Sequence, residues 1–536
     1  MEPRDPDPGA TCALPSPGRP AARGLWAWVA IAVALHLALG AAFWFVCDDA
    51  YISWRYAANL VAGEGLTWNP GEAPPVEGYS EFGWVLVAAA VQAAGLAPDT
   101  WLPLLSLACG ALLAGRVVRF LGRDLVQHPI ALAGGALFVG TAIPLSVWST
   151  GGMGTQPALL CLWLFFEALL GSLHRHEGVK AGLAGAGLVL LRADGHLWVF
   201  LLGALALGIA RLRRDACLAR AAAWACGLPL AAFAAHTALR LGVHGDWLPN
   251  TARAKVELTA FTLERGARYV GSFLLAFPGV VLALGAFGMH GRRVLERPTL
   301  AALLATLAAL AYSVAVGGDF MCFHRFLLPV WPFGAVLFAK ALQALAEDGG
   351  ARRRAALVLA AVVITTNALP GAGLEVVPQP VRETCWFRFN ARDASGAMLF
   401  RSEHEQWQDM AARAREWRRL GEALAEHTEP EDRLCAGAIG AVGWASGLVV
   451  YDQFGLTRRD VESFPEVPGE RSPGHDRYAP PSWFQAEGAT IARAAVLDAR
   501  VVAQRGTPPP HVRVIPLDPD RYGANQTLVL EGFPRP

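Results

Sequence analysis

Residues 25–60 read LWAWVAIAVALHLALGAAFWFVCDDAYISWRYAANL, and this stretch decides the fold class. Its first part, Leu25 to Val46, contains no Asp, Glu, Lys or Arg, and about 20 apolar residues in a helix can cross a bilayer. The segment is too long and too far from the N-terminus for a typical cleaved signal peptide, so we interpret it as an uncleaved anchor. Residues 1–23 are rich in Pro, Asp and Gly and are predicted to form a disordered cytosolic tail.

The pattern of the first span continues along most of the chain. Hydrophobic residues make up 54% of the sequence and charged residues only 17%, whereas a soluble domain carries about 25% charge. Further apolar segments occupy residues 80–96, 101–119, 129–147, 156–172, 179–191, 196–210, 219–241, 270–289, 299–316, 326–346 and 355–369. We therefore predict that residues 24–370 form an all-α polytopic membrane domain.

Basic clusters predict how this domain is oriented. Lys and Arg collect in cytosolic loops, and such clusters lie at Arg211–Arg214, Arg292–Arg293 and Arg352–Arg354. If 80–96 and 101–119 both crossed fully, the basic loop at 116–123 would fall outside, so we expect one net crossing there. About eleven transmembrane helices then place the N-terminus inside and the C-terminal part outside.

From about Gly371 the composition becomes that of a water-soluble domain. Arg, Glu, Asp and Pro become frequent, and a charged helical stretch at 403–426 precedes short β-type runs at 448–451, 500–503, 511–515 and 527–530. We predict a small soluble α/β domain over residues 371–536. If it faces an oxidising periplasm, Cys385 and Cys435 could pair.

Composition also excludes some partners. The formal net charge is +1, and no basic stripe suggests a nucleic-acid partner. The nine cysteines include no CxxC pair and no Cys/His cluster, which argues against a zinc or redox site.

Two adjacent carboxylates, Asp48 and Asp49, follow the first span directly. A carboxylate there can act as general base towards a sugar hydroxyl, or the pair can hold a divalent cation through oxygen ligands. The alternative is that both residues only cap the helix that follows, because acidic groups are favoured at a helix N-terminus.

Other polar residues gather at the same predicted external face. Cations beside carboxylates at a membrane surface suit a phosphate-bearing lipid, since Lys and Arg neutralise and orient phosphate oxygens. The alternatives are headgroup snorkelling for Lys255 and Arg325, and a local ion pair for Arg192 with Asp194. The candidate site residues in these loops are Arg55, Glu77, Tyr79, Arg192, Asp194, Asn250, Lys255, Asp319, His324 and Arg325.

Five motifs, in a fixed order along most of the chain, resemble one known family. They are DDAYISWRYAANLVAGEGLTWNPGEAPPVEGYSE, LLRADG, HGDWLPNTARAK, GGDFMCFHRFLLP and AIGAVGWASGLVVYDQFGLT. The chain resembles the terminal β-arabinofuranosyltransferases of mycobacterial cell walls, which are grouped with a flagellar motor-control protein. This family belongs to the polytopic glycosyltransferases of the C-type fold.

The resemblance implies a membrane enzyme that uses a polyprenyl-phosphate sugar as donor and a glycan or other cell-envelope molecule as acceptor. It implies the bacterial inner (plasma) membrane, with active site and C-terminal domain on the extracytoplasmic side. Catalytic aspartates are expected at Asp48 and Asp49, and five motif positions are expected in the site: Glu77, Asn250, Lys255, Asp319 and Arg325. No organic cofactor is implied, and a divalent cation at the aspartate pair stays an open alternative.

Three departures from the family pattern leave the sugar open, arabinose included. Residues 151–155 read GGMGT and lack the family's acid, Ala193 stands where a proline is usual, and Trp444-Ala445 replaces a pair of tyrosines.

The expected mechanism places the donor phosphate at Lys255, Arg325 and His324, while Asp48 or Asp49 deprotonates the acceptor hydroxyl. Two rival functions stay open. One is a secondary transporter, which would need ionisable residues near the midplane and two related repeats. The other is a non-catalytic, motor-associated regulatory protein that keeps the fold.

Overall fold

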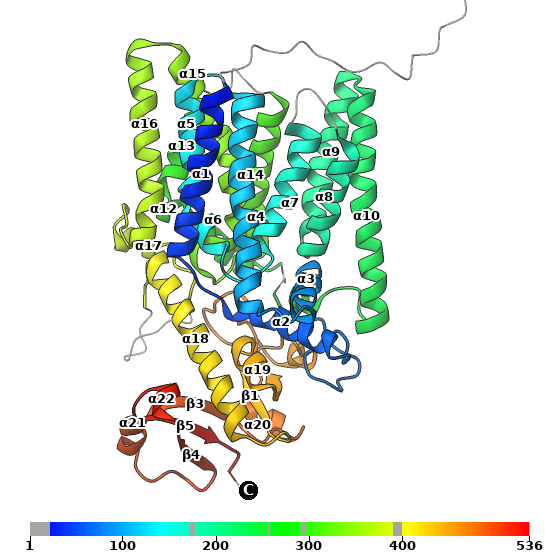
Figure 1. Cartoon of the computed structure of the whole chain (residues 1–536), viewed down its shortest axis with the longest axis vertical. Coiled ribbons are helices and arrows are strands. Elements are labelled where there is room, and N and C mark those ends of the chain that lie inside the picture. Colours follow the sequence, from blue (N-terminus) through cyan, green and yellow to red (C-terminus); the bar gives the residue numbers. More distant parts are fainter. Residues whose placement is uncertain (1–21, 172–176, 256–257, 291–295, 390–398, 535–536) are drawn as a thin grey trace, which may run out of the picture.

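The computed structural model describes residues 22–171, 177–255, 258–290, 296–389 and 399–534. Figure 1 shows a bundle of long helices, with the C-terminal region attached at one end of it. The bundle consists of α1 (Ala22–Ala42), α4 (Pro98–Phe120), α5 (Pro129–Gly140), α7 (Thr155–Phe166), α8 (Gly178–Leu191), α9 (Gly195–Arg213), α10 (Ala216–His244), α12 (Ala260–Ala276), α13 (Pro278–His290), α14 (Arg297–Ala315), α15 (Val330–Glu347) and α16 (Gly350–Ala368).

Length and composition mark six of the described helices as long and apolar enough to cross a membrane. The pair α12 and α13, bent by 90° at Phe277, makes a seventh if it counts as one broken span. The chain is therefore a multi-pass membrane protein, but the predicted count of about eleven is not confirmed. Much of the shortfall comes from apolar helices of 12 to 14 residues such as α5, α7 and α8, which extend only roughly 18–21 Å along their axes.

The helix α3 (Phe82–Ala93) explains the predicted single net crossing over residues 80–119. At its start Glu81 accepts a hydrogen bond from Ser53, and near its end Gln92 donates to the carbonyl of Trp54. Both ends of α3 therefore contact the same part of α2 (Asp48–Val61), because Ser53 and Trp54 are neighbours in the chain. With 12 residues α3 extends only roughly 18 Å, which is too short for a full crossing. Only α4 then passes from this end to the other.

One end of the bundle collects the short elements that build the site. These are α2, α3, α6 (Ile143–Trp148), α11 (Asn250–Lys255) and the 3-10 helix η4 (Cys322–Leu327). The C-terminal region lies at the same end, as Figure 1 shows, whereas the arginines at the end of α9 and the start of α16 lie at the opposite end. Two π-helical turns, η1 (Leu121–Leu125) and η2 (Glu167–Gly171), extend α4 and α7.

The C-terminal region is built around the long helix α18 (Glu403–His427) and two small sheets. The parallel pair β1 (Arg433–Ala436) and β2 (Val449–Asp452) is connected by α19 (Gly440–Ser446), and the antiparallel sheet has the order β3-β5-β4. The remaining elements are η5 (Leu369–Ala372), α17 (Gln379–Glu383), η6 (Asp460–Ser463), α20 (Pro481–Gln485), β3 (Arg493–Asp498), α21 (Ala499–Gln504), β4 (Val512–Pro516), α22 (Pro519–Tyr522) and β5 (Gln526–Glu531).

One local prediction for this region is wrong, and one open possibility is not realised in the structure. The run 500–503 forms helix α21, because the Asp498 side chain accepts the Arg500 N–H and caps a helix there. Cys385 and Cys435 are both free thiols. Cys385 packs against Gly271 of α12, whereas Cys435 is buried in β1.

Two glycines let α19 dock closely on α2. A Cβ at Gly440 would lie 2.0 Å from the main-chain oxygen of Asp48, and one at Gly443 would lie 2.9 Å from the Trp68 ring. Because both distances are below any tolerated contact, only glycine fits at these positions. The late motif AIGAVGWASG is thus one segment that attaches the C-terminal region to the residues that follow the first span.

Candidate active site

The two adjacent carboxylates begin α2, but their surroundings differ. The Asp48 carboxylate accepts backbone N–H groups at the start of α19, from Ala441 at 2.7 Å and Gly440 at 3.1 Å. Burial raises the pKa of Asp48 to about 7, although these two hydrogen bonds act in the opposite direction. Asp49 has no such partner among the described residues and lies within electrostatic range of Arg325. Asp48 therefore binds the start of α19, whereas the Asp49 carboxylate has no such contact among the described residues.

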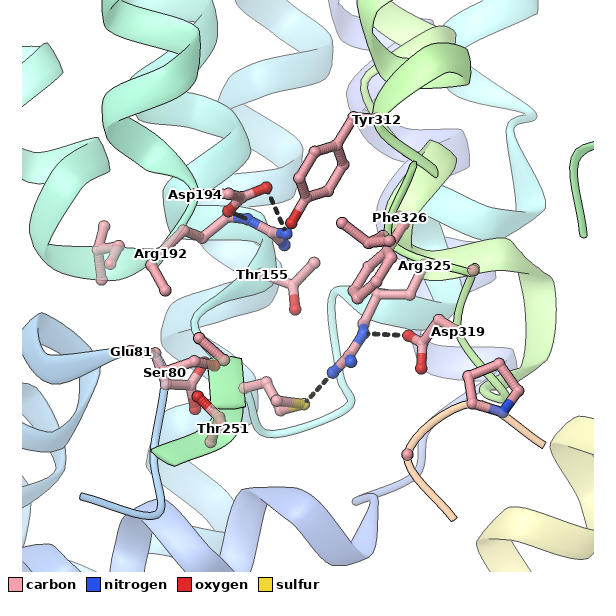
Figure 2. A pocket seen from close by; sticks show the side chains of 18 residues that line it. Ser80, Glu81, Thr155, Arg192, Asp194, Thr251, Tyr312, Asp319, Arg325 and Phe326 are labelled. Atoms are coloured by element: carbon pink, nitrogen blue, oxygen red, sulfur yellow. Dashed lines mark hydrogen bonds and ion pairs between the residues drawn. The ribbon is translucent and has the colours of Figure 1, made fainter. Parts of the chain in front are cut away.

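A cavity of about 150 Å³ opens at the bundle end and holds two arginine–aspartate pairs. We name it the bundle cavity. It is lined by Ser80, Glu81, Met153, Thr155, Leu191, Arg192, Ala193, Asp194, Thr251, Ala252, Tyr312, Val316, Gly318, Asp319, Arg325, Phe326, Pro473 and Gly474. Figure 2 shows the two pairs on opposite walls, with the Tyr312 hydroxyl beside Arg192 and Asp194.

The guanidinium groups of Arg192 and Arg325 each have N–H donors beyond those that bind their aspartates. Arg192 and Asp194 form a bidentate ion pair, with Nε–Oδ1 at 2.6 Å and Nη2–Oδ2 at 3.0 Å. Arg325 Nε donates to Asp319 at 2.8 Å and Nη1 contacts the Met153 sulfur at 3.0 Å. Because a guanidinium has five N–H donors, each arginine can still bind an anion. Burial alone would raise the pKa of Asp194, but Arg192 outweighs this and holds the pKa below its usual value.

A small void of about 20 Å³ adjoins the bundle cavity between the helices. The two share Thr155, Arg192, Asp194, Tyr312, Arg325 and Phe326. Beyond these residues the void is lined by Ala158, Leu159, Leu162, Leu188, Trp198, Leu328 and Pro329. A void of this size holds about one water molecule, so the bundle cavity is closed on this side by apolar side chains.

Glu81 is a site residue that the sequence analysis did not single out. Its carboxylate accepts hydrogen bonds from the Ser53 hydroxyl and the Gly154 N–H, each at 2.9 Å, and it lines the bundle cavity. Burial raises the pKa of Glu81 to about 7. The only signal in the sequence is its place at the end of the first motif, after Tyr79-Ser80.

A second cavity, of about 400 Å³, lies between the bundle end and the C-terminal region. We name it the interface cavity. Its lining contains Cys47, Asp48, Asp49, Ile52, Phe320, Met321, Trp386, Arg388, Arg401, Gln406, Asp409, Met410, Arg413, Trp417, Gly437, Ala438, Ile439, Asp452, Phe454, Leu456, Gly474 and His475. Gly474 lines the bundle cavity as well, so the two cavities border each other at this residue.

The arginines of the interface cavity are held by acidic partners. Arg388 binds Glu403 at 2.8 Å, and Arg401 and Arg413 share Asp409 at 2.7 and 3.0 Å. These ion pairs hold N–H donors in the wall of the cavity that also contains Asp49, together with the aromatic side chains of Phe320, Trp386, Trp417 and Phe454. Such a mixture of stacking surfaces and hydrogen-bonding groups suits a carbohydrate.

Four predicted site residues lie instead in the joint between bundle and C-terminal region, and none of them lines the cavities described above. Arg55 donates to the main-chain oxygens of Trp68, Gly443 and Leu448. Asn250 donates to the carbonyls of Gly455 and Leu456, at 2.7 and 2.9 Å. The other two, Glu77 and Tyr79, contact Arg240 and His244 of α10.

The three residues predicted to bind the donor phosphate, Lys255, His324 and Arg325, differ in where the structure places them. Arg325 lines the bundle cavity. His324 is fully buried among the rings of Tyr269, Phe273 and Phe387 and lines none of these cavities, so a direct phosphate contact does not fit its position. Lys255 ends α11, but its side chain lies outside the described residues.

The aspartate pair is a poor fit for a divalent cation. Asp48 uses both carboxylate oxygens on backbone N–H groups. In the part of the chain that the structure describes, no group of three or more His, Cys, Asp or Glu residues is placed to hold a metal ion.

Comparisons with known proteins identify the fold class. The crystal structure of ArnT from Cupriavidus metallidurans bound to undecaprenyl phosphate matches with a TM-score of 0.52 and 14% identity, over 96% of this chain and 100% of ArnT. The apo structure of the same protein matches with a TM-score of 0.47 and 14% identity, over 95% and 99% of the two chains. The chain therefore has the polytopic C-type glycosyltransferase fold of ArnT, and the match does not distinguish the arabinofuranosyltransferase subfamily.

Sequence comparisons add a single local match. Residues 401–513 match the model of a domain of unknown function, DUF8728, which begins just before α18 and ends in β4. No curated protein matches the chain.

Proposed function

We propose that this protein is a membrane glycosyltransferase that takes its sugar from a polyprenyl-phosphate donor. One observation carries the proposal: the bundle cavity holds two arginines and borders the interface cavity, which holds Asp49. The shared fold with a protein described as bound to undecaprenyl phosphate supports the same class of donor.

The donor phosphate binds at Arg325 and Arg192, whose free N–H groups face the bundle cavity. Its polyprenyl chain lies in the surrounding bilayer. Lys255 is a third candidate cation at this site, as the family resemblance implies. The acceptor is a glycan or another cell-envelope molecule that enters the interface cavity.

In the reaction, the acceptor hydroxyl gives its proton to Asp49 while its oxygen forms a bond to the anomeric carbon. The bond from that carbon to the phosphate oxygen breaks, and its electron pair leaves with the polyprenyl phosphate. The two arginines balance the charge that develops on this phosphate, and nearby carboxylates stabilise the oxocarbenium character of the sugar. Arabinofuranose is the candidate sugar that the family resemblance suggests.

The direct test is transfer by the purified protein in lipid nanodiscs, with a panel of radiolabelled undecaprenyl-phosphate sugars. Donor binding is measured separately with undecaprenyl phosphate. The double variant Arg325→Gln/Asp319→Asn removes both charges of the buried pair, so no unpaired carboxylate is left behind. We expect a ten- to hundredfold weaker affinity, since a charge-assisted hydrogen bond contributes about 1.5–3 kcal/mol.

The matched control is Arg268→Gln, because Arg268 lies outside the three cavities and pairs with Glu264 and Glu470 on the surface. Equal affinity in the double variant and the control would refute the donor site. Absence of transfer from every donor in the panel, by a protein that binds undecaprenyl phosphate, would refute the reaction.

A further inference from the structure

The interface cavity does not end at the membrane-facing part of the molecule. A third cavity, of about 450 Å³, continues from it into the C-terminal region, and we name it the distal cavity. It is lined by Trp417, Leu420, Leu434, Cys435, Ala436, Gly437, Ala438, Val442, Gln453, Arg493, Ala494, Ala495, Leu497, Arg505, Val529 and Glu531. Trp417, Gly437 and Ala438 line both cavities, so together they form one continuous path.

One face of the β3-β5-β4 sheet forms a wall of the distal cavity. Side chains alternate along a strand, and Arg493, Ala495 and Leu497 share one face of β3. Across the ladder, Glu531 lies opposite Arg493 and Val529 opposite Ala495. The small Ala495 side chain keeps the centre of this face open.

The distal cavity is cationic at its far end. Arg493 and Arg505 line it, against the single carboxylate of Glu531. Within the described ranges, neither arginine side chain takes part in an ion pair or a hydrogen bond. By contrast, all three arginines of the interface cavity are paired.

We propose that the distal cavity binds the far part of a long acceptor, and that this acceptor is a glycan chain carrying acidic groups. The inference rests on the proposed function, in which the acceptor hydroxyl reacts at Asp49. Each cavity alone has the size of a site for one small molecule, so two in series suit a ligand several sugar units long. The shared Trp417 offers a ring for stacking at the junction, and the unpaired arginines bind acidic groups at the far end.

The position of the distal cavity favours a glycan over a lipid tail. In Figure 1 the sheet β3-β5-β4 lies at the end of the molecule farthest from the helical bundle. A ligand that follows the path from Asp49 therefore leads away from the bilayer, where a hydrocarbon chain would be exposed to water.

The test uses the full-length protein in nanodiscs and no donor, so its outcome is independent of transfer activity. Binding of α-1,4-galacturonate oligomers of two and six units is measured by calorimetry. We expect the hexamer to bind at least tenfold more tightly than the dimer, and more tightly than neutral malto-hexaose or hexaglutamate. Equal affinity for hexamer and dimer overturns the extended site; equal affinity for malto-hexaose overturns the acidic preference, and for hexaglutamate the preference for carbohydrate.

Variants separate the distal cavity from the rest of the path. Ala495→Trp should fill it, lowering hexamer affinity to that of the dimer and leaving dimer affinity unchanged. Arg505→Ala, at an exposed position that does not endanger folding, should weaken hexamer binding about tenfold. The control Arg500→Ala lies on α21 outside the lining and should change nothing. A loss in the control equal to that in Arg505→Ala would overturn the proposal.

Discussion

Replacing Asp49 or Asp48 by Asn should have two different effects. Asp49 is the proposed base, and loss of general-base help typically costs 10²–10⁴ in rate. Asp49→Asn should therefore lower transfer from the donor by at least a hundredfold, while the protein keeps its parent stability and its affinity for undecaprenyl phosphate.

Asp48→Asn should instead weaken the attachment of α19. An Asn side chain keeps one acceptor oxygen, but its amide group faces a backbone N–H and leaves that donor unsatisfied. The contact distances of 2.7 and 3.1 Å mark both hydrogen bonds as fully formed. An unsatisfied buried donor costs about 1–3 kcal/mol. We therefore expect a lower melting temperature and faster proteolytic cleavage of the chain around α19, where the contact with α2 is weakened.

The assay combines single-turnover transfer with thermal melting in nanodiscs for the two variants and for Asp99→Asn. Asp99 pairs with Arg418 at the same end of the bundle and lines none of the four cavities, so its loss should change neither quantity much. If Asp49→Asn transferred sugar near the parent rate, or if Asp48→Asn lost only activity and kept the parent melting temperature, the division of roles would be refuted.

Three further predictions use the same docking surface and the chain's orientation. Gly440→Ala places a methyl group 2.0 Å from the Asp48 carbonyl and should undock α19, detected by proteolysis; Gly208→Ala, where nothing lies within 4 Å, is the control. Because the pKa of Asp48 is raised to about 7, this carboxyl binds its proton more tightly in the folded state, and stability should fall as pH rises from about 4 to 7. This component of the pH dependence of melting should vanish in Asp48→Asn, and an identical profile in parent and variant would contradict it. A reporter enzyme fused after Pro536 should be active only outside the cytoplasm, and cytosolic activity would overturn the proposed orientation of every site loop.

The multi-pass helical membrane domain could be predicted from the sequence because its signals are local, although the number of spans could not. An apolar run such as Leu25 to Val46 predicts a membrane helix independently of the segments that pack against it. The same holds for Asp48-Asp49, which stand out as charges beside an apolar segment. The short helix α3 was harder, since its apolar composition matches a span and only the structure shows that it ends after 12 residues.

The roles of individual polar residues could not be predicted, because they depend on partners far along the chain. Arg55 looks like a ligand-binding cation in the first loop, but Gly443 and Leu448 accept its hydrogen bonds. His324 precedes Arg325 directly, but a turn with positive φ at Phe323 and His324 sends the imidazole into an aromatic cage. Sequence spacing alone carries no information about such turns.

The hydrogen bonds between Asp48 and α19 also have a consequence for the order in which the site is completed during synthesis. Asp48 and Gly440 stand 392 positions apart, so the first loop is made long before the helix that completes its surroundings. A nascent chain with all its membrane helices inserted still lacks the wall that holds Asp48 and borders Asp49. We expect a chain truncated at residue 370 to bind undecaprenyl phosphate without transferring sugar, so that no donor is consumed before the protein is finished.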